Sequence, residues 1–219
     1  KFIKTTTKEF SHTCPVVQQA ALDWPVTRFR LTHNGQDAAD YPAAASRRDR
    51  ILQVYGMRFV EQSAAVSRER AGIRVEGLTI QPMHSRAGRN PQELFVNRRA
   101  VKNAAVSHAV YDAYGTYLAK GQHPQFVLFL DVDSERVDVN VHPTKREVRF
   151  ADQDLVFQAV RQAVRAAIGA AAKPEAASYQ PSVVSHEPVF SGTMPGLDQQ
   201  MLAGFTGGAL PAGSTVQES

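Results

Sequence analysis

Lys145 is the residue of this sequence whose surroundings best suit contact with a phosphate group. It follows the stretch 137–142, in which valines alternate with polar residues at the period of a half-buried strand. Pro143 ends that strand, because proline has no N–H to donate to a ladder. The turn then presents a flexible cation that could reach a phosphate as a point charge. The alternative is a solvated loop lysine, since lysine is usually exposed.

A second group of cations lies between a short strand and a helix. Arg98, Arg99 and Lys102 follow the apolar pair Phe95–Val96 and precede an expected helix start. Cations at that position repel the positive end of the helix dipole, so the arrangement favours a nearby anion. The phosphate of a DNA backbone would serve, without any reading of base edges. A solvated basic loop is the alternative interpretation.

Other candidate residues favour ordinary surface roles. Arg86 and Arg89 in a glycine-containing loop, and Arg161 and Arg165 on one face of a helix, could extend the basic surface, but a solvated face is the favoured interpretation. His142 belongs to the turn before Lys145, since no second His or Cys lies at metal-ligand spacing. The sequence therefore predicts no metal site.

The charge of the chain is unevenly distributed. All 25 Lys and Arg residues lie before residue 174, whereas four of the 21 acidic residues follow it, so residues 1–173 carry +8 and residues 174–219 carry −4. A basic folded part is compatible with a polyanionic partner. The single Cys14 excludes an internal disulfide, and no long apolar run predicts a membrane span. The first residue is Lys rather than Met, which predicts a piece of a longer polypeptide.

The apolar patterns predict an α+β fold, a two-layer mixed sheet with helices. Helices are expected over about 9–22, 46–55, 103–120 and 152–171, and strands over 26–33, 61–70, 72–83, 94–97, 125–132 and 137–141. The strand order does not follow from these patterns. From residue 174 onward Pro, Gly, Ser, Ala and Gln dominate, which predicts a flexible linker. Within it, residues 197–205 are a docking peptide or merely a less polar island.

Several ordered segments resemble the MutL family of mismatch-repair ATPases. Residues 137–150 are similar to the family signature V-D-V-N-V-H-P-x-K-x-E-V-R-F, and Glu93–Arg99 is similar to F-V-N-G-R. Further matches are 1–4 with 9–12, 107–110 and 123–130, so the resemblance covers about residues 1–170. It implies a fold like domain 2 of ribosomal protein S5. Residues 1–22 would be a connecting helix after an absent ATPase domain, 23–173 the transducer domain, and 174–219 a flexible linker.

The resemblance also implies roles for particular residues. Lys145 would contact the terminal phosphate of ATP, as both a catalytic and a cofactor-binding residue. ATP and Mg²⁺ would be held by an upstream domain, and neither by this stretch alone, which has no P-loop and should not hydrolyse ATP. Arg99 and Lys102 carry over as DNA-binding residues. Arg98 stands where the family has Gly, so its DNA-binding role rests on charge alone and the turn geometry is in question. Ala104 stands where a second family arginine is common.

The implied parent is a DNA mismatch repair protein in which the ATP state is coupled to DNA binding and dimerisation. The implied partners are DNA, a second MutL protomer in a homodimer, a MutS-type mismatch-recognition protein, and a downstream repair nuclease or helicase. The implied location is the bacterial cytoplasm at the nucleoid, with no membrane partner. Three alternatives remain open: an S5-like RNA-binding module, the transducer domain of a type II topoisomerase, and a purely structural coupling role.

Overall fold

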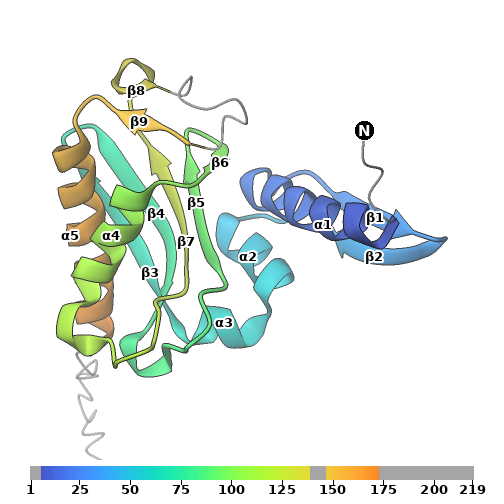
Figure 1. Ribbon diagram of the computed structural model, residues 1–219, viewed down its shortest axis with the longest axis horizontal. Coiled ribbons are helices and arrows are strands. Elements are labelled where there is room, and N and C mark those ends of the chain that lie inside the picture. Colours follow the sequence, from blue (N-terminus) through green and yellow to red (C-terminus); the bar gives the residue numbers. More distant parts are fainter. Residues whose placement is uncertain (1–5, 139–146, 173–219) are drawn as a thin grey trace, which may run out of the picture. The chain divides into compact units, whose positions relative to one another are not determined.

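The computed structural model describes residues 6–138 and 147–172 (Figure 1). Its helices are α1 (Thr6–Asp23), α2 (Arg47–Tyr55), α3 (Met57–Glu61), α4 (Ala104–Tyr114) and α5 (Gln153–Ala172). Its strands are β1 (Phe29–His33), β2 (Gln36–Tyr41), β3 (Ser63–Arg70), β4 (Ile73–Ile80), β5 (Gln92–Val96), β6 (Arg99–Val101), β7 (Phe126–Asp131), β8 (Val137–Asp138) and β9 (Arg149–Phe150). Short 3-10 turns cover Pro82–His84, Gly115–Tyr117 and Ser134–Arg136.

The central sheet has the order β3-β4-β7-β5-β6. Strand β5 runs parallel to β7, and the other neighbouring pairs are antiparallel, so the sheet is mixed. Gly77 of β4 has φ of +138°, and a Cβ atom there would overlap the carbonyl oxygen of Val127 in β7. Only glycine therefore allows β4 and β7 to pair at this point. The predicted α+β class with a mixed sheet is confirmed.

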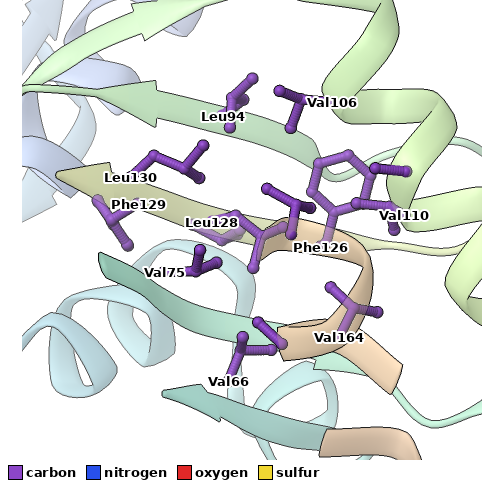
Figure 2. Close-up of a cluster of buried hydrophobic side chains, with 14 of the residues drawn as sticks. Val66, Val75, Leu94, Val106, Val110, Phe126, Leu128, Phe129, Leu130 and Val164 are labelled. Atoms are coloured by element: carbon purple, nitrogen blue, oxygen red, sulfur yellow. The ribbon is translucent and has the colours of Figure 1, made fainter. Parts of the chain in front are cut away.

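Helices α4 and α5 cover one face of this sheet (Figure 1). Figure 2 shows valines of α4 and α5 gathered with apolar side chains of β4, β5 and β7; the labelled members include Val106, Val110, Val164, Val75, Leu94, Phe126 and Leu128. On the opposite side of β7, the guanidinium of Arg47 from α2 lies 4.4 Å from the ring centroid of Phe129. Because both faces are covered, β7 is an uninterrupted apolar run rather than an alternating one.

Capping side chains mark the starts of α2 and α5, where the sequence predicted that helices begin. Ser46 accepts a hydrogen bond from the N–H of Asp49 at 3.1 Å, and Asp152 accepts one from Leu155 at 2.9 Å. The prediction that the helix after Asn103 reaches about residue 120 is wrong. Gly115, with φ of +49°, ends α4 after Tyr114.

Two further strand boundaries differ from the expectation. Residue 61 was expected in a strand but ends helix α3, and β3 begins at Ser63. Strand β4 stops at Ile80 rather than continuing to Met83, because Pro82 opens a 3-10 turn and cannot donate to the ladder. Met83 is 80% exposed, so it lies outside the core.

Strands β1 and β2 form a separate two-stranded sheet. Their turn places Asn34 and Gly35 at positive φ, as the Asn-Gly pair predicts. Arg50 of α2 is fully buried and donates to the carbonyl oxygens of Pro25, Thr27 and Tyr41, which ties both ends of the hairpin to α2.

Candidate nucleic-acid interface

The turn that joins β5 to β6 carries the first predicted DNA-binding cation. Val96 pairs with Arg99, and both residues between them, Asn97 and Arg98, have positive φ of 46° and 61°. Positive φ at both central residues is the geometry of a type I′ hairpin turn. Arg98 stands where the family segment has glycine, and its backbone nevertheless has the left-handed conformation that glycine favours.

Asn97 holds this turn against the end of β7. Its Nδ2 donates to the carbonyl oxygen of Val132 at 2.7 Å, and its Oδ1 accepts from the N–H of the same residue at 2.9 Å. Its backbone N–H donates to the carbonyl oxygen of Leu130 at 2.9 Å. Asparagine also tolerates the left-handed region better than most residues. The turn residues therefore have a fixed orientation relative to the sheet.

The side chain of Arg98 is directed toward the end of α1. Its guanidinium lies 4.9 Å from the ring centroid of Trp24, a cation–π contact. Beside it, Asp23 is buried and one of its carboxylate oxygens has no hydrogen-bond partner. Burial raises the pKa of Asp23, and the charges of Arg98 and Arg47 oppose that rise. Arg98 therefore interacts with residues of its own chain, and its predicted DNA-binding role is not tested by these contacts.

Arg99, in the edge strand β6, and Lys102, just after it, are both exposed. Val101 between them is buried, which fixes the backbone that carries them. Lys102 lines a cavity of about 820 Å³ together with Arg89 and Arg149. Two carboxylates, of Glu93 and Glu147, also line this cavity. The tertiary structure therefore brings two more arginines to the side of Lys102.

For Arg89, the sequence favoured a solvated surface. Arg149 alternates with buried residues in β9, so the sequence shows that it points away from the core but not which strand it faces. Arg89 lies in the loop before β5, and its Nε is 3.4 Å from His123 Nε2. No local pattern links either residue to Lys102, because the segments are brought together only by folding.

The remaining basic candidates have partners within the chain or face solvent. Arg86 donates to Gln62 Oε1 at 2.9 Å, and Arg161 pairs with Asp112 across the α4–α5 contact. Arg165 is exposed. These residues do not extend the cavity surface around Lys102.

Lys145 and His142 lie outside the described residues, so the predicted phosphate contact is not tested. The structure does place the chain on both sides of that segment. Strand β8 pairs with β9, and Glu147 forms an isolated parallel bridge with Lys102. Asn103 Nδ2 donates to the carbonyl oxygen of Val148 at 3.0 Å.

Among residues 6–138 and 147–172, no three His, Cys, Asp or Glu side chains form a group that could hold a metal ion. Within the same residues, no helix has the length and apolar character needed to cross a bilayer.

A family model and curated relatives that match this chain are all described as DNA mismatch repair proteins. Residues 51–169 match the family model described as the C-terminal domain of DNA mismatch repair protein. The DNA mismatch repair protein MutL of Xylella fastidiosa (strain 9a5c) is 40% identical over 166 residues, which are 75% of this chain and 27% of that protein. The MutL of Pseudomonas fluorescens (strain SBW25) is 43% identical over 159 residues, which are 71% of this chain and 25% of that protein. The chain thus spans about a quarter of the length of these relatives.

A solved structure has a similar fold. The crystal structure of the N-terminal domain of a DNA repair protein superposes with a TM-score of 0.59 at 21% sequence identity. The match covers 76% of this chain and 55% of that one. At this level of identity the likeness concerns the fold.

Proposed function

This chain belongs to the MutL family of DNA mismatch repair proteins, and from that premise we propose that it binds the DNA backbone and couples that binding to the ATP state of its parent protein. Arg99 and Lys102 contact DNA phosphates, and Arg98 adds charge at the same turn. Lys145 contacts the γ-phosphate of ATP. In this proposal residues 23–173 are the transducer domain, residues 1–22 connect it to an upstream ATPase domain, and residues 174–219 are a linker.

One observation gives the main support for the proposal that this chain binds DNA. Arg99 in the edge strand β6 and Lys102 just after it are exposed, and Lys102 lines a cavity with two further arginines, although these four residues come from three separate parts of the chain. Among the described residues that line this cavity, the three cations outnumber the two carboxylates, those of Glu93 and Glu147, so the lining is net positive and favours an anionic ligand. DNA presents closely spaced phosphates, and contacts to them require no base-specific geometry.

The nucleotide half rests on the resemblance of residues 137–150 to the family signature. A cation on the γ-phosphate stabilises the charge that develops during phosphoryl transfer and also distinguishes ATP from ADP. ATP and Mg²⁺ would be bound mainly by the upstream domain, and this chain would contribute Lys145. The parent would work in the cytoplasm with a second MutL protomer, a MutS-type protein and a downstream nuclease or helicase.

The DNA-binding proposal is tested by the salt dependence of duplex-DNA affinity. A variant with Arg99→Ala and Lys102→Ala is compared with a control, Arg48→Ala and Arg68→Ala, which removes two exposed cations from elsewhere. Each phosphate contact contributes about 0.9 to the slope of log affinity against log salt, so the first variant should have a slope shallower by about 1.8. If the two variants have equal slopes of log affinity against log salt, Arg99 and Lys102 do not contact DNA phosphates. Stronger competition by structured RNA than by duplex DNA would favour the RNA-binding alternative.

The nucleotide proposal is tested with Lys145→Ala in a chain that carries a MutL ATPase domain upstream. ATP turnover should slow while the circular-dichroism spectrum is unchanged. If turnover and nucleotide affinity both stay at the parental values, Lys145 does not contact the γ-phosphate.

A further inference from the structure

We infer that Asn103 is a positioning residue that transmits DNA binding at β6 to the segment that follows Lys145. This inference rests on the proposed function, because it joins the DNA-binding and nucleotide-contacting parts of that proposal. It goes beyond it by naming a physical connection between the two parts.

The connection is made by the two ends of one side-chain amide. Asn103 Oδ1 accepts a hydrogen bond from the N–H of Val106 at 3.0 Å, which caps α4. Its Nδ2 donates to the carbonyl oxygen of Val148 at 3.0 Å. An amide supplies an acceptor and a donor at once, whereas an ionised Asp supplies acceptors only. Asn103 therefore both begins α4 and holds the backbone just before β9.

Each of the two residues joined by this hydrogen bond is also held by other contacts. Val148 is only 4% exposed and belongs to the apolar core, so its carbonyl group has a fixed position. Asn103 follows Lys102 directly, and Lys102 itself forms a parallel bridge with Glu147. The pairs 102–103 and 147–148 thus lie side by side through two adjacent contacts. A displacement of one pair must strain or break contacts to the other.

Both proposed phosphate contacts are close to this junction along the chain. Lys102 is one residue from Asn103, and Lys145 is three residues before Val148. A DNA phosphate that restrains Lys102 therefore also restrains residues 147–148, which follow Lys145 closely in the sequence.

A capping role alone would explain the first hydrogen bond but not the second. Asn103→Ser separates the two, because serine is an equally good N-cap but lacks the amide nitrogen that donates to the carbonyl oxygen of Val148. Asn103→Asp keeps the cap acceptor and also removes the donor, but it adds a negative charge beside Lys102. We therefore expect Asn103→Ser to keep DNA affinity within about twofold of wild type, because N-cap substitutions among these residues change little. The Asp variant should bind DNA more weakly.

Hydrogen–deuterium exchange of the whole chain provides the test. Amide exchange in residues 147–150 is measured with and without saturating duplex DNA. In the wild type, DNA should slow exchange there by about fivefold or more, the lower end of typical coupling between two sites. In both Asn103 variants, at DNA concentrations that saturate each one, that slowing should be lost.

The outcomes separate the inference from the function on which it rests. If the wild-type chain fails to bind duplex DNA at low salt, both the DNA-binding proposal and the inference are wrong. If DNA binds with the expected salt slope but slows exchange equally in wild type and Asn103→Ser, the inference alone is wrong. Retention of the slowing in the variant would show that DNA protects these amides directly.

Discussion

The buried guanidinium of Arg50 gives the sharpest stability prediction for this protein. It is fully buried, and it donates to three backbone carbonyl oxygens, at 2.6 Å to Pro25, 2.6 Å to Thr27 and 3.1 Å to Tyr41. Burial also lowers the pKa of the Arg50 guanidinium, because desolvation disfavours its charge. Arg50→Met keeps most of the side-chain volume and removes every donor.

The expected loss of stability follows from those carbonyl groups. The carbonyl oxygen of Pro25 keeps a second hydrogen bond, from the N–H of Ala44 at 2.8 Å, so the variant leaves the carbonyl groups of Thr27 and Tyr41 without the Arg50 donor. An unsatisfied buried acceptor costs about 1–3 kcal/mol, so two of them cost about 2–6 kcal/mol. Removal of the buried charge offsets part of this, because desolvating a guanidinium is itself unfavourable. We therefore expect Arg50→Met to lower the free energy of unfolding by about 2–4 kcal/mol, which is a large part of the stability of an ordinary domain.

Urea unfolding followed by circular dichroism measures this change. Arg48→Met is the matched control, since Arg48 is exposed on the same helix and its replacement should change stability by less than about 0.5 kcal/mol. Arg50→Lys should recover only part of the loss, because an ammonium group lacks the planar fork that reaches three acceptors. A loss below about 1 kcal/mol for Arg50→Met would refute the reasoning, since it would mean that water replaces the guanidinium at the carbonyl groups of Thr27 and Tyr41.

Two further predictions concern a backbone contact and a buried carboxylate. Gly77→Ala should prevent β4 from pairing with β7, because the added Cβ overlaps the carbonyl oxygen of Val127; soluble yield and thermal unfolding should fall sharply, whereas Gly88→Ala, where a Cβ meets nothing within 4 Å, should leave both unchanged. Asp23 has a raised pKa in the folded state, so the folded form binds the proton more tightly and stability is lost as pH rises from the ordinary value of 3.8 through the raised value. Asp23→Asn should remove that loss, and a difference in unfolding free energy between the two proteins that does not change with pH would contradict it.

Helix caps and tight turns, whose contacts join residues only a few positions apart, could be predicted from the sequence. Ser46 and Asp152 cap the helices that begin after them, and Asn34–Gly35 forms a tight turn, as these residue types favour. In each case the hydrogen bond or the allowed backbone region involves neighbours along the chain, so no knowledge of the tertiary structure is needed. Strand β2 was missed because the sequence QDAADY has neither alternation nor β-branched residues, and it is a strand through its pairing with β1.

The candidate site could be predicted only in part. The sequence placed Arg99 and Lys102 together because they are three residues apart, and the family signature drew attention to Lys145. It could not show that Arg89 and Arg149 reach the cavity beside Lys102, because these residues are 13 and 47 positions away from it in the chain.

The sequence by itself determined the α+β class, most helix and strand positions, the basic character of residues 1–173 and the family of the protein. These properties depend on residue types and on periodicities of a few residues. Only the tertiary structure decided that Arg98 lies over Trp24, that Arg50 is buried, and that Asn103 holds the carbonyl group of Val148. Such contacts join segments 40 or more residues apart or depend on burial, so their energies are set by the packing of the whole sheet and its helices and not by the local chain.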